Sequence, residues 1–318
     1  MTAPRRRTPP VFWLPRSALA VCLAATLSAC HDAPTAPAPI TNSTGITNST
    51  GIYPGFDISV YPGDALMNAW KRPASPYYWS SYYLSAPCHK PQTSWLGKRA
   101  TLEAMGWGLA VIYVGQQYWK PAQLASAVDP WRNALIVSTT TCSNTRLTAA
   151  QGVIDADEAI TSTAEEGFPA GSTIFLDIEH MDAIPAAMTD YYKAWVERLL
   201  SAPARYRPGI YCHTANAAQI SAIVVASYAA LGRTDQPLFW LVGSGTGFAL
   251  TNPPSGAGFS FASVWQNPHF DRTESYGGFT ATIDQDVATT RSPSAPVGAS
   301  VLSAKEVVPY ALPIRGND

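Results

Sequence analysis

The sequence has few charges and no basic stripe. Charged residues make up 14% of the 318-residue chain, and 21 Lys and Arg stand against 22 Asp and Glu. Nucleic-acid-binding proteins gather positive charge on one face, so nucleic acid is not an expected partner. The histidines also lack the spacing of a metal site, and we expect no metal. They are His31, His89, His180, His213 and His269.

Long hydrophobic runs are also missing. The apolar run at residues 18–27, "ALAVCLAATL", is too short to span a bilayer but has the length of a signal-peptide core. Three arginines precede it at residues 5–7, and "LSAC" follows at residues 27–30. A small-residue site before a cysteine resembles the lipobox of bacterial lipoproteins. The resemblance implies a signal peptide at residues 1–29, cleavage before Cys30 and a lipid on its thiol. The alternative is an ordinary secretory signal in which Cys30 is incidental.

Residues 30–52 lack the apolar bulk that a fold needs. They contain two copies of "TNSTGI", at residues 41–46 and 47–52, and are otherwise rich in Pro, Ala, Ser and Thr. Such a segment cannot bury enough surface to offset its ordering entropy, so we expect a disordered tether. Without the signal the chain has 17 basic and 22 acidic residues, a net charge of −5. We therefore expect a protein secreted across the inner membrane and held by lipid in the bacterial cell envelope, in the periplasm or at the cell surface.

The body of the chain, residues 53–290, alternates apolar strands with helices. This pattern is typical of a parallel sheet covered by helices, and about eight strands favour a single-domain α/β protein with a (β/α)₈ barrel. A doubly wound open sheet is the alternative, although no GxGxxG follows the first strand. No cofactor is expected. Residues 291–318 are expected to form a tail. The expected strands are 55–61, 77–85, 107–115, 172–179, 207–212, 238–244, 262–266 and 280–288, and the expected helices are 94–106, 148–168, 185–202 and 215–232.

The stretch "IFLDIEHMD", residues 174–182, runs an apolar strand into two acids. Side chains two apart on a strand share a face, so Asp177 and Glu179 point one way while Leu176 and Ile178 point the other. In a barrel the acids would face the mouth, where such enzymes place their chemistry. Two close carboxylates raise each other's pKa, so one can keep a proton and serve as a glycosidic acid. The alternative is that both acids are structural.

Other predicted strand ends carry acids and amides. The first predicted strand carries "GFDIS" with Asp57, Trp265 and Gln266 end the seventh strand, and "IDQD" contains Asp284 and Asp286. The motifs "GFDISVYPG", "FLDIE", "GIYC", "VWQ" and "IDQD" occur in the order seen in family 25 glycoside hydrolases, the lysozyme-type muramidases. With "YYLSAP" and the helix before "WGLAVIYVG", the chain is identified as a member of the bacterial glycoside-hydrolase-like domain family of unknown function (the DUF1906 group), related to those muramidases.

The resemblance implies a role for each matching residue. Glu179 matches the general acid, and Asp177 matches the acid that assists an N-acetyl group acting as internal nucleophile. Asp57 and Asp284 match acids of the first and last strands, with Asp286 replacing Asp284 if the alignment slips by two. The residues expected to bind substrate are Trp265, Gln266, Tyr211, Tyr113 and Asp286.

The resemblance implies a hydrolase of N-acetylated glycan such as peptidoglycan. The chain departs from the muramidases at His180, which follows the glutamate, and at Cys212, where they carry a small or hydroxyl residue. The glycoside-hydrolase-like group has no firmly implied activity. A glycan-binding barrel without catalysis and an envelope accessory protein therefore remain alternatives.

Three cysteines remain beyond Cys30 in the mature chain. Cys88 follows the second predicted strand and Cys142 precedes a predicted helix, so both should lie in loops on the catalytic face. In an oxidising compartment a pair normally bridges. We predict a Cys88–Cys142 disulfide and a buried, free Cys212.

Overall fold

The computed structural model describes residues 51–89, 93–119, 141–203, 205–243 and 247–297. Within these residues eight strands close into a barrel surrounded by helices, as the alternating pattern predicts. The strands follow one another around the barrel in the order β1 to β7, and β9 closes the ring between β7 and β1. They are β1 (Tyr53–Asp57), β2 (Trp79–Tyr83), β3 (Gly108–Val114), β4 (Thr173–Ile178), β5 (Arg207–His213), β6 (Leu238–Val242), β7 (Ala262–Gln266) and β9 (Phe279–Ala288).

The closing strand runs against the others. Strands β1 to β7 pair in parallel, whereas β9 pairs antiparallel with both β1 and β7. The reversal arises because an additional strand, β8 (Arg272–Tyr276), forms an antiparallel hairpin with β9 after β7. No local pattern predicts β8, because its residues are largely exposed and carry no apolar alternation. We call the end of the barrel where β1 to β7 finish the mouth.

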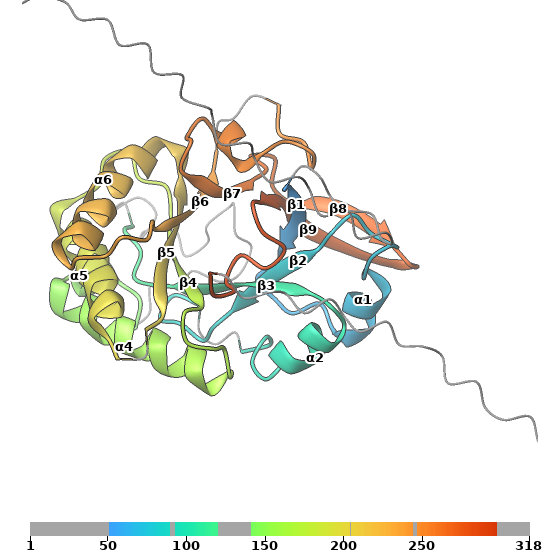
Figure 1. The fold of residues 1–318 in the computed structure, drawn as a ribbon, viewed down its shortest axis with the longest axis horizontal. Helices are drawn as coiled ribbons and strands as arrows, with labels where there is room; N and C mark the ends of the chain where they lie inside the picture. The colour runs from blue at the N-terminus through green and yellow to red at the C-terminus, as the bar shows by residue number, and fades with distance from the viewer. Residues whose placement is uncertain (1–50, 90–92, 120–140, 204, 244–246, 298–318) are drawn as a thin grey trace, which may run out of the picture. The chain divides into compact units, whose positions relative to one another are not determined.

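Helices pack outside the strands. Figure 1 shows α4, α5 and α6 side by side on one flank and α1 and α2 on another. Local signals explain where the long ones begin: the Thr148 side chain caps α4, and Pro185 precedes α5. No helix in these ranges is long and apolar enough to cross a membrane. The bounds are α1 (Asp64–Ala69), α2 (Arg99–Ala104), α4 (Ala149–Glu165), α5 (Ala186–Ser201) and α6 (Thr214–Ala230), with short 3₁₀ turns η1 (Asn144–Arg146) and η2 (Pro254–Ala257).

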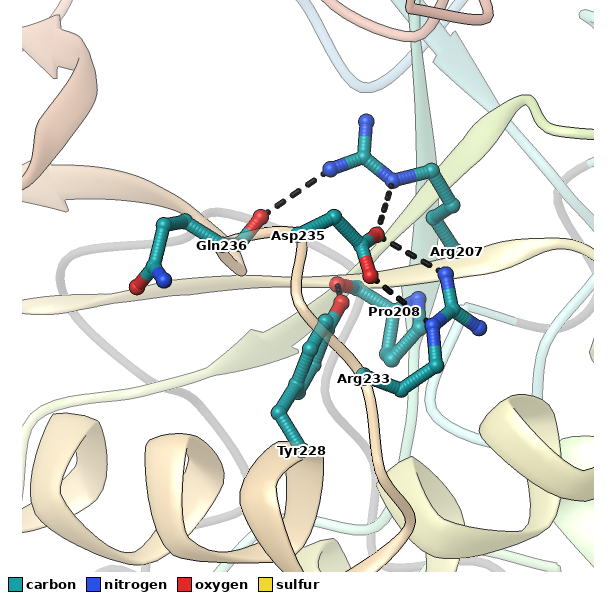
Figure 2. A network of polar contacts seen from close by, with 6 residues as sticks. All are labelled: Arg207, Pro208, Tyr228, Arg233, Asp235 and Gln236. Carbon is teal, nitrogen blue, oxygen red and sulfur yellow. Dashed lines mark hydrogen bonds and ion pairs between the residues drawn. The ribbon is translucent and has the colours of Figure 1, made fainter.

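A polar network lies at the start of β5, at the end of the barrel opposite the mouth. Arg207 Nε lies 3.1 Å from Asp235 Oδ2, and Arg233 binds the same carboxylate (Figure 2). Burial alone would raise the pKa of Asp235, but the two arginines lower it. Nearby, the Tyr228 hydroxyl donates to the Pro208 carbonyl at 3.0 Å. This network holds the start of β5 in place, at the end of the strand that lies away from the mouth.

The chain beyond residue 290 also packs against the end of the barrel opposite the mouth. Ser294 Oγ accepts the Val111 N–H at 2.7 Å, and the Thr173 N–H donates to the Ser294 carbonyl at 2.9 Å. The expected boundary at residue 290 therefore falls inside the packed unit. The expected signal peptide, Cys30 and almost all of the tether lie outside the described residues.

The predicted disulfide is present. Cys88 and Cys142 are bonded, with their Cα atoms 5.1 Å apart. Cys212 is free and buried, as predicted. The bridge joins the segment after β2 to the segment before α4.

Candidate functional site

Asp57 lies at the mouth, at the end of β1, and is only 7% exposed. Its Oδ1 accepts a hydrogen bond from the Tyr83 hydroxyl at 2.6 Å, and Gln266 Nε2 lies 3.4 Å from its Oδ2. These partners come from β2 and β7. The antiparallel register places Asp284 directly opposite Asp57. Because paired residues on antiparallel strands share a face, the two carboxyl groups face the same lumen.

Asp286 lies one layer deeper, opposite Gly55. It is fully buried, and Trp240 Nε1 donates to its Oδ1 at 2.9 Å. Its Oδ2 has no hydrogen-bond partner within the described part of the chain. Burial raises the pKa of Asp286 well above its usual range, and the charges of Asp57 and Asp284 raise it further. The neutral, protonated form of Asp286 is therefore favoured.

Aromatic rings form a floor beneath the carboxylates. The Trp240 ring contacts Trp79, Phe175 and Tyr211 edge-on, at centroid distances of 5.4, 5.7 and 5.6 Å. Gly55 makes room for this arrangement, because a Cβ there would lie 2.1 Å from the Trp79 ring. The floor gives the mouth an apolar base below its ring of acids.

Strand β4 brings the two central acids to the same lumen. Phe175 contacts Trp240 inside the barrel, so Asp177, two positions later, faces inward as well. Asp177 is 5% exposed, whereas Glu179 lies just beyond the strand and is partly exposed. Asp177 also stands beside Tyr211 in the β4–β5 ladder. The predicted acids of β1, β4 and β9 thus line one barrel.

Two histidines border Glu179. The rings of His180 and His213 are 4.6 Å apart. His213 Nδ1 accepts the Ala215 N–H at 3.1 Å and so caps α6. Burial lowers the pKa of His213 and His180 lowers it further, while the Glu179 charge opposes both effects. A neutral His213 is also what its capping role needs, since only an unprotonated Nδ1 can accept.

Two expected substrate-binding residues lie outside the lumen. The Tyr113 ring stacks on Trp195 of α5, and its hydroxyl lies 3.4 Å from Glu158 of α4. Trp265 packs under η2 and contacts Phe248 with ring centroids 5.0 Å apart. Neither side chain therefore faces the lumen that holds the predicted acids. Neighbouring strand residues alternate, so Gln266 faces the lumen and Trp265 cannot.

The sequence analysis also missed residues of the site. Tyr83 binds Asp57, and Trp240 binds Asp286. Tyr83 lies in "YYLS" and Trp240 lies in "LFWLV". Counting alternate positions back from the strand end would have found Trp240. Which tyrosine of the pair Tyr82 and Tyr83 faces the lumen depends on the strand register.

A cavity of about 340 Å³ lies beside the mouth, not within it. Its lining includes Gln285, which alternates with Asp284 and Asp286 and so faces away from them. None of the predicted catalytic acids lines this cavity. The predicted acids therefore lie in the lumen, apart from this cavity. The other lining residues are Gly247, Phe248, Ala249, Leu250, Asn267, Pro268, His269 and Arg272.

A closed α/β barrel with carboxylates gathered at its mouth is an arrangement suited to glycoside hydrolase chemistry. The chain belongs to the Rv2525c-like, glycoside hydrolase-like domain family, whose model matches residues 68–288. The match includes Asp177, Glu179, Asp284 and Asp286, while Asp57 lies ahead of it. No curated protein matches the chain.

Solved structures resemble the chain at low identity. An uncharacterized B. stearothermophilus protein is 20% identical with a TM-score of 0.48, covering 74% of this chain and 95% of that one. The Mycobacterium tuberculosis Tat-secreted protein Rv2525c in complex with L-tartrate is 17% identical with a TM-score of 0.42, covering 75% and 95%. The Clostridium perfringens spore cortex lytic enzyme SleM is 11% identical with a TM-score of 0.46, covering 77% and 69%.

Proposed function

We propose that this protein is a cell-envelope glycoside hydrolase acting on N-acetylated glycan such as peptidoglycan. The observation that carries the proposal is the end of β4, where buried Asp177 and partly exposed Glu179 follow Phe175 into the acid-lined lumen. Glycosidic cleavage uses two carboxyl groups with different environments, one giving a proton and one staying charged. Membership of a glycoside hydrolase-like family agrees with this chemistry.

The proposed reaction assigns one role to each acid. Glu179 donates a proton to the glycosidic oxygen as the bond from that oxygen to the anomeric carbon breaks. The substrate's N-acetyl oxygen attacks the anomeric carbon, and Asp177 stabilises the positive charge that develops on the acetamido group. Glu179, now a carboxylate, takes a proton from the water that completes hydrolysis. Asp57 and Asp284 line the sugar site.

The lumen suits a sugar. The edge of the aromatic floor offers Tyr211, which is 7% exposed, beside Asp177.

The proposal includes a location. The "LSAC" at residues 27–30 supports a lipid on Cys30, and residues 31–52 would then tether the barrel to the membrane. Envelope glycan would lie within reach of such a tether. The disulfide agrees with an oxidising compartment.

The test is the release of reducing ends from purified peptidoglycan and from chitin-type oligomers. We expect Glu179→Gln to lower turnover by about 10²–10⁴-fold, because an amide cannot supply the proton. Asp177→Asn should also lower turnover, whereas Asp157→Asn is a matched control. Asp157 pairs with Arg198 on the outer helices, at 2.7 Å, and should have wild-type activity.

The same assay separates the alternatives. A wild-type protein that binds glycan but releases no ends over a range of pH would be a binding barrel. If the acids are structural, Asp177→Asn should lower the melting temperature and have no effect on glycan binding or cleavage. Either result would reject hydrolysis.

A further inference from the structure

The backbone that carries Glu179 extends past its neighbouring strand. The β3–β4 ladder ends where Val114 pairs with Asp177. The Asp177 carbonyl and the Glu179 N–H both point toward the β3 side, one step beyond that last pair. Main-chain groups buried in this position need partners from outside the ladder.

The Gln117 side chain supplies both partners. Its Nε2 donates to the Asp177 carbonyl at 2.8 Å, and its Oε1 accepts the Glu179 N–H at 3.1 Å. In a parallel ladder, a residue donates its N–H to a carbonyl of the neighbouring strand. Its own carbonyl accepts the N–H of the residue two positions further along that strand. The amide therefore acts as a further ladder residue opposite Ile178. Gln117 is 1% exposed, so water does not compete for these bonds.

A second buried amide holds the next part of the segment. Asn216, in the first turn of α6, donates to the Met181 carbonyl at 2.8 Å and accepts the Met181 N–H at 3.0 Å. On the β5 side, Ile178 pairs with Cys212. Glu179 thus lies between two side-chain amides that each bind the main chain twice.

Gln117 is itself held from behind. The preceding residue, Gln116, is held by two hydrogen bonds. Its N–H donates to the Tyr191 hydroxyl at 3.0 Å, and its Nε2 donates to the Thr141 carbonyl at 2.9 Å. Tyr191 belongs to α5, and Thr141 adjoins the bridged Cys142. The clamp on Glu179 is therefore anchored to the outer helices and to the disulfide segment.

We propose that Gln117 is a positioning residue, which fixes the direction of the Glu179 carboxyl group in the mouth by completing the β4 ladder. It acts through the main chain and does not touch the substrate. The inference rests on the proposed hydrolase function for its kinetic test. Its structural content, the clamp on the Glu179 main chain, can be measured without turnover.

The kinetic test compares Gln117→Ala with a control of similar burial. We expect Gln117→Ala to lower kcat by about 10²-fold with little change in KM, because a misplaced catalytic group costs rate while the sugar site stays intact. Tyr228→Phe removes a buried side-chain hydrogen bond to the Pro208 carbonyl at the far end of the barrel (Figure 2). It should lower the melting temperature and leave kcat unchanged.

Gln117→Glu tests the hydrogen-bond pattern itself. A protonated carboxyl group has one donor and one acceptor and can replace the amide, whereas a carboxylate cannot donate to the Asp177 carbonyl. The activity of this variant, relative to wild type at the same pH, should recover as the pH falls. A purely volume-filling role would give a constant ratio.

Amide hydrogen exchange at Glu179 gives a readout that needs no substrate. Gln117→Ala should speed exchange of the Glu179 N–H, while Tyr228→Phe should not. Wild-type protein without glycan turnover, but with faster exchange in Gln117→Ala, would reject the proposed hydrolysis and retain the clamp. Unchanged exchange would overturn the inference in either case. So would an unchanged kcat in Gln117→Ala of an active enzyme.

Discussion

At the scale of single residues, the carboxyl groups of the barrel differ in their surroundings. Asp57 lies at the mouth and accepts the Tyr83 hydroxyl. Asp286 is one layer deeper, fully buried and close to two other carboxylates. Burial and the neighbouring charges together favour the neutral form of Asp286.

Asp286 should make stability depend on pH in a defined direction. Its pKa is raised in the folded protein, so the folded state holds a proton that the unfolded state releases above about pH 3.8. The stabilisation is complete below that pH and is lost as the pH rises through the folded pKa. Each pKa unit of elevation corresponds to about 1.4 kcal/mol.

We expect Asp286→Asn to remove this loss, because an amide stays neutral at every pH. Urea unfolding at a series of pH values should show the variant gaining free energy of unfolding relative to wild type as the pH rises above 4. Parallel curves for wild type and Asp286→Asn would contradict a raised pKa.

At the scale of elements, the direction of one strand decides which residues meet. The sequence analysis placed acids at the carboxyl ends of the first, fourth and last strands. Strand β9 runs antiparallel, so its carboxyl end lies away from the mouth. Asp284 reaches the mouth because it pairs with Asp57, and Asp286 lies deeper because it pairs with Gly55.

The disulfide connects two elements near the proposed clamp. It links residues separated by 54 positions, and the loop-entropy model gives a stabilisation of about 4 kcal/mol, less any strain. We expect the Cys88→Ala, Cys142→Ala double variant to lose up to that free energy of unfolding. Wild type unfolded under reducing conditions should match the double variant. A loss seen only in the variant would point to packing of the cysteine side chains and not to the bridge.

At the scale of the whole molecule, the barrel belongs to a glycoside hydrolase-like family, while the proposed anchor depends on residues outside the described ranges. Lipid attachment at Cys30 would place an acidic domain on a membrane through a segment of about twenty residues. The anchor and the barrel can therefore be tested independently.

We expect the wild-type protein to fractionate with membranes in a lipidated form. Cys30→Ala should release the protein or block its processing, because no thiol remains to carry the lipid. Cys212→Ala, which changes a buried cysteine of the barrel, is the matched control and should stay with the membranes. A Cys30→Ala protein that matures normally and remains membrane-bound would contradict lipidation.

The sequence by itself determined the barrel, the segments that form most of its strands and long helices, and the pairing of Cys88 with Cys142. These follow from local patterns: apolar strands alternate with helices, and chain order brings loops to one face. The same alternation correctly placed Asp177 on the opposite face from Leu176. Period and order are properties of the chain alone.

Only the tertiary structure decided the direction of β9, the burial of Asp286 and the partners of the lumen residues. Tyr113 and Trp265 lie on strands at the expected places, yet they face the helices and η2 because strand register determines which face is inside. Gln117 carries no local signal, since its importance comes from main-chain groups 60 and 62 residues away. Long-range register and hydrogen bonding depend on the closed barrel, and a local pattern does not contain them.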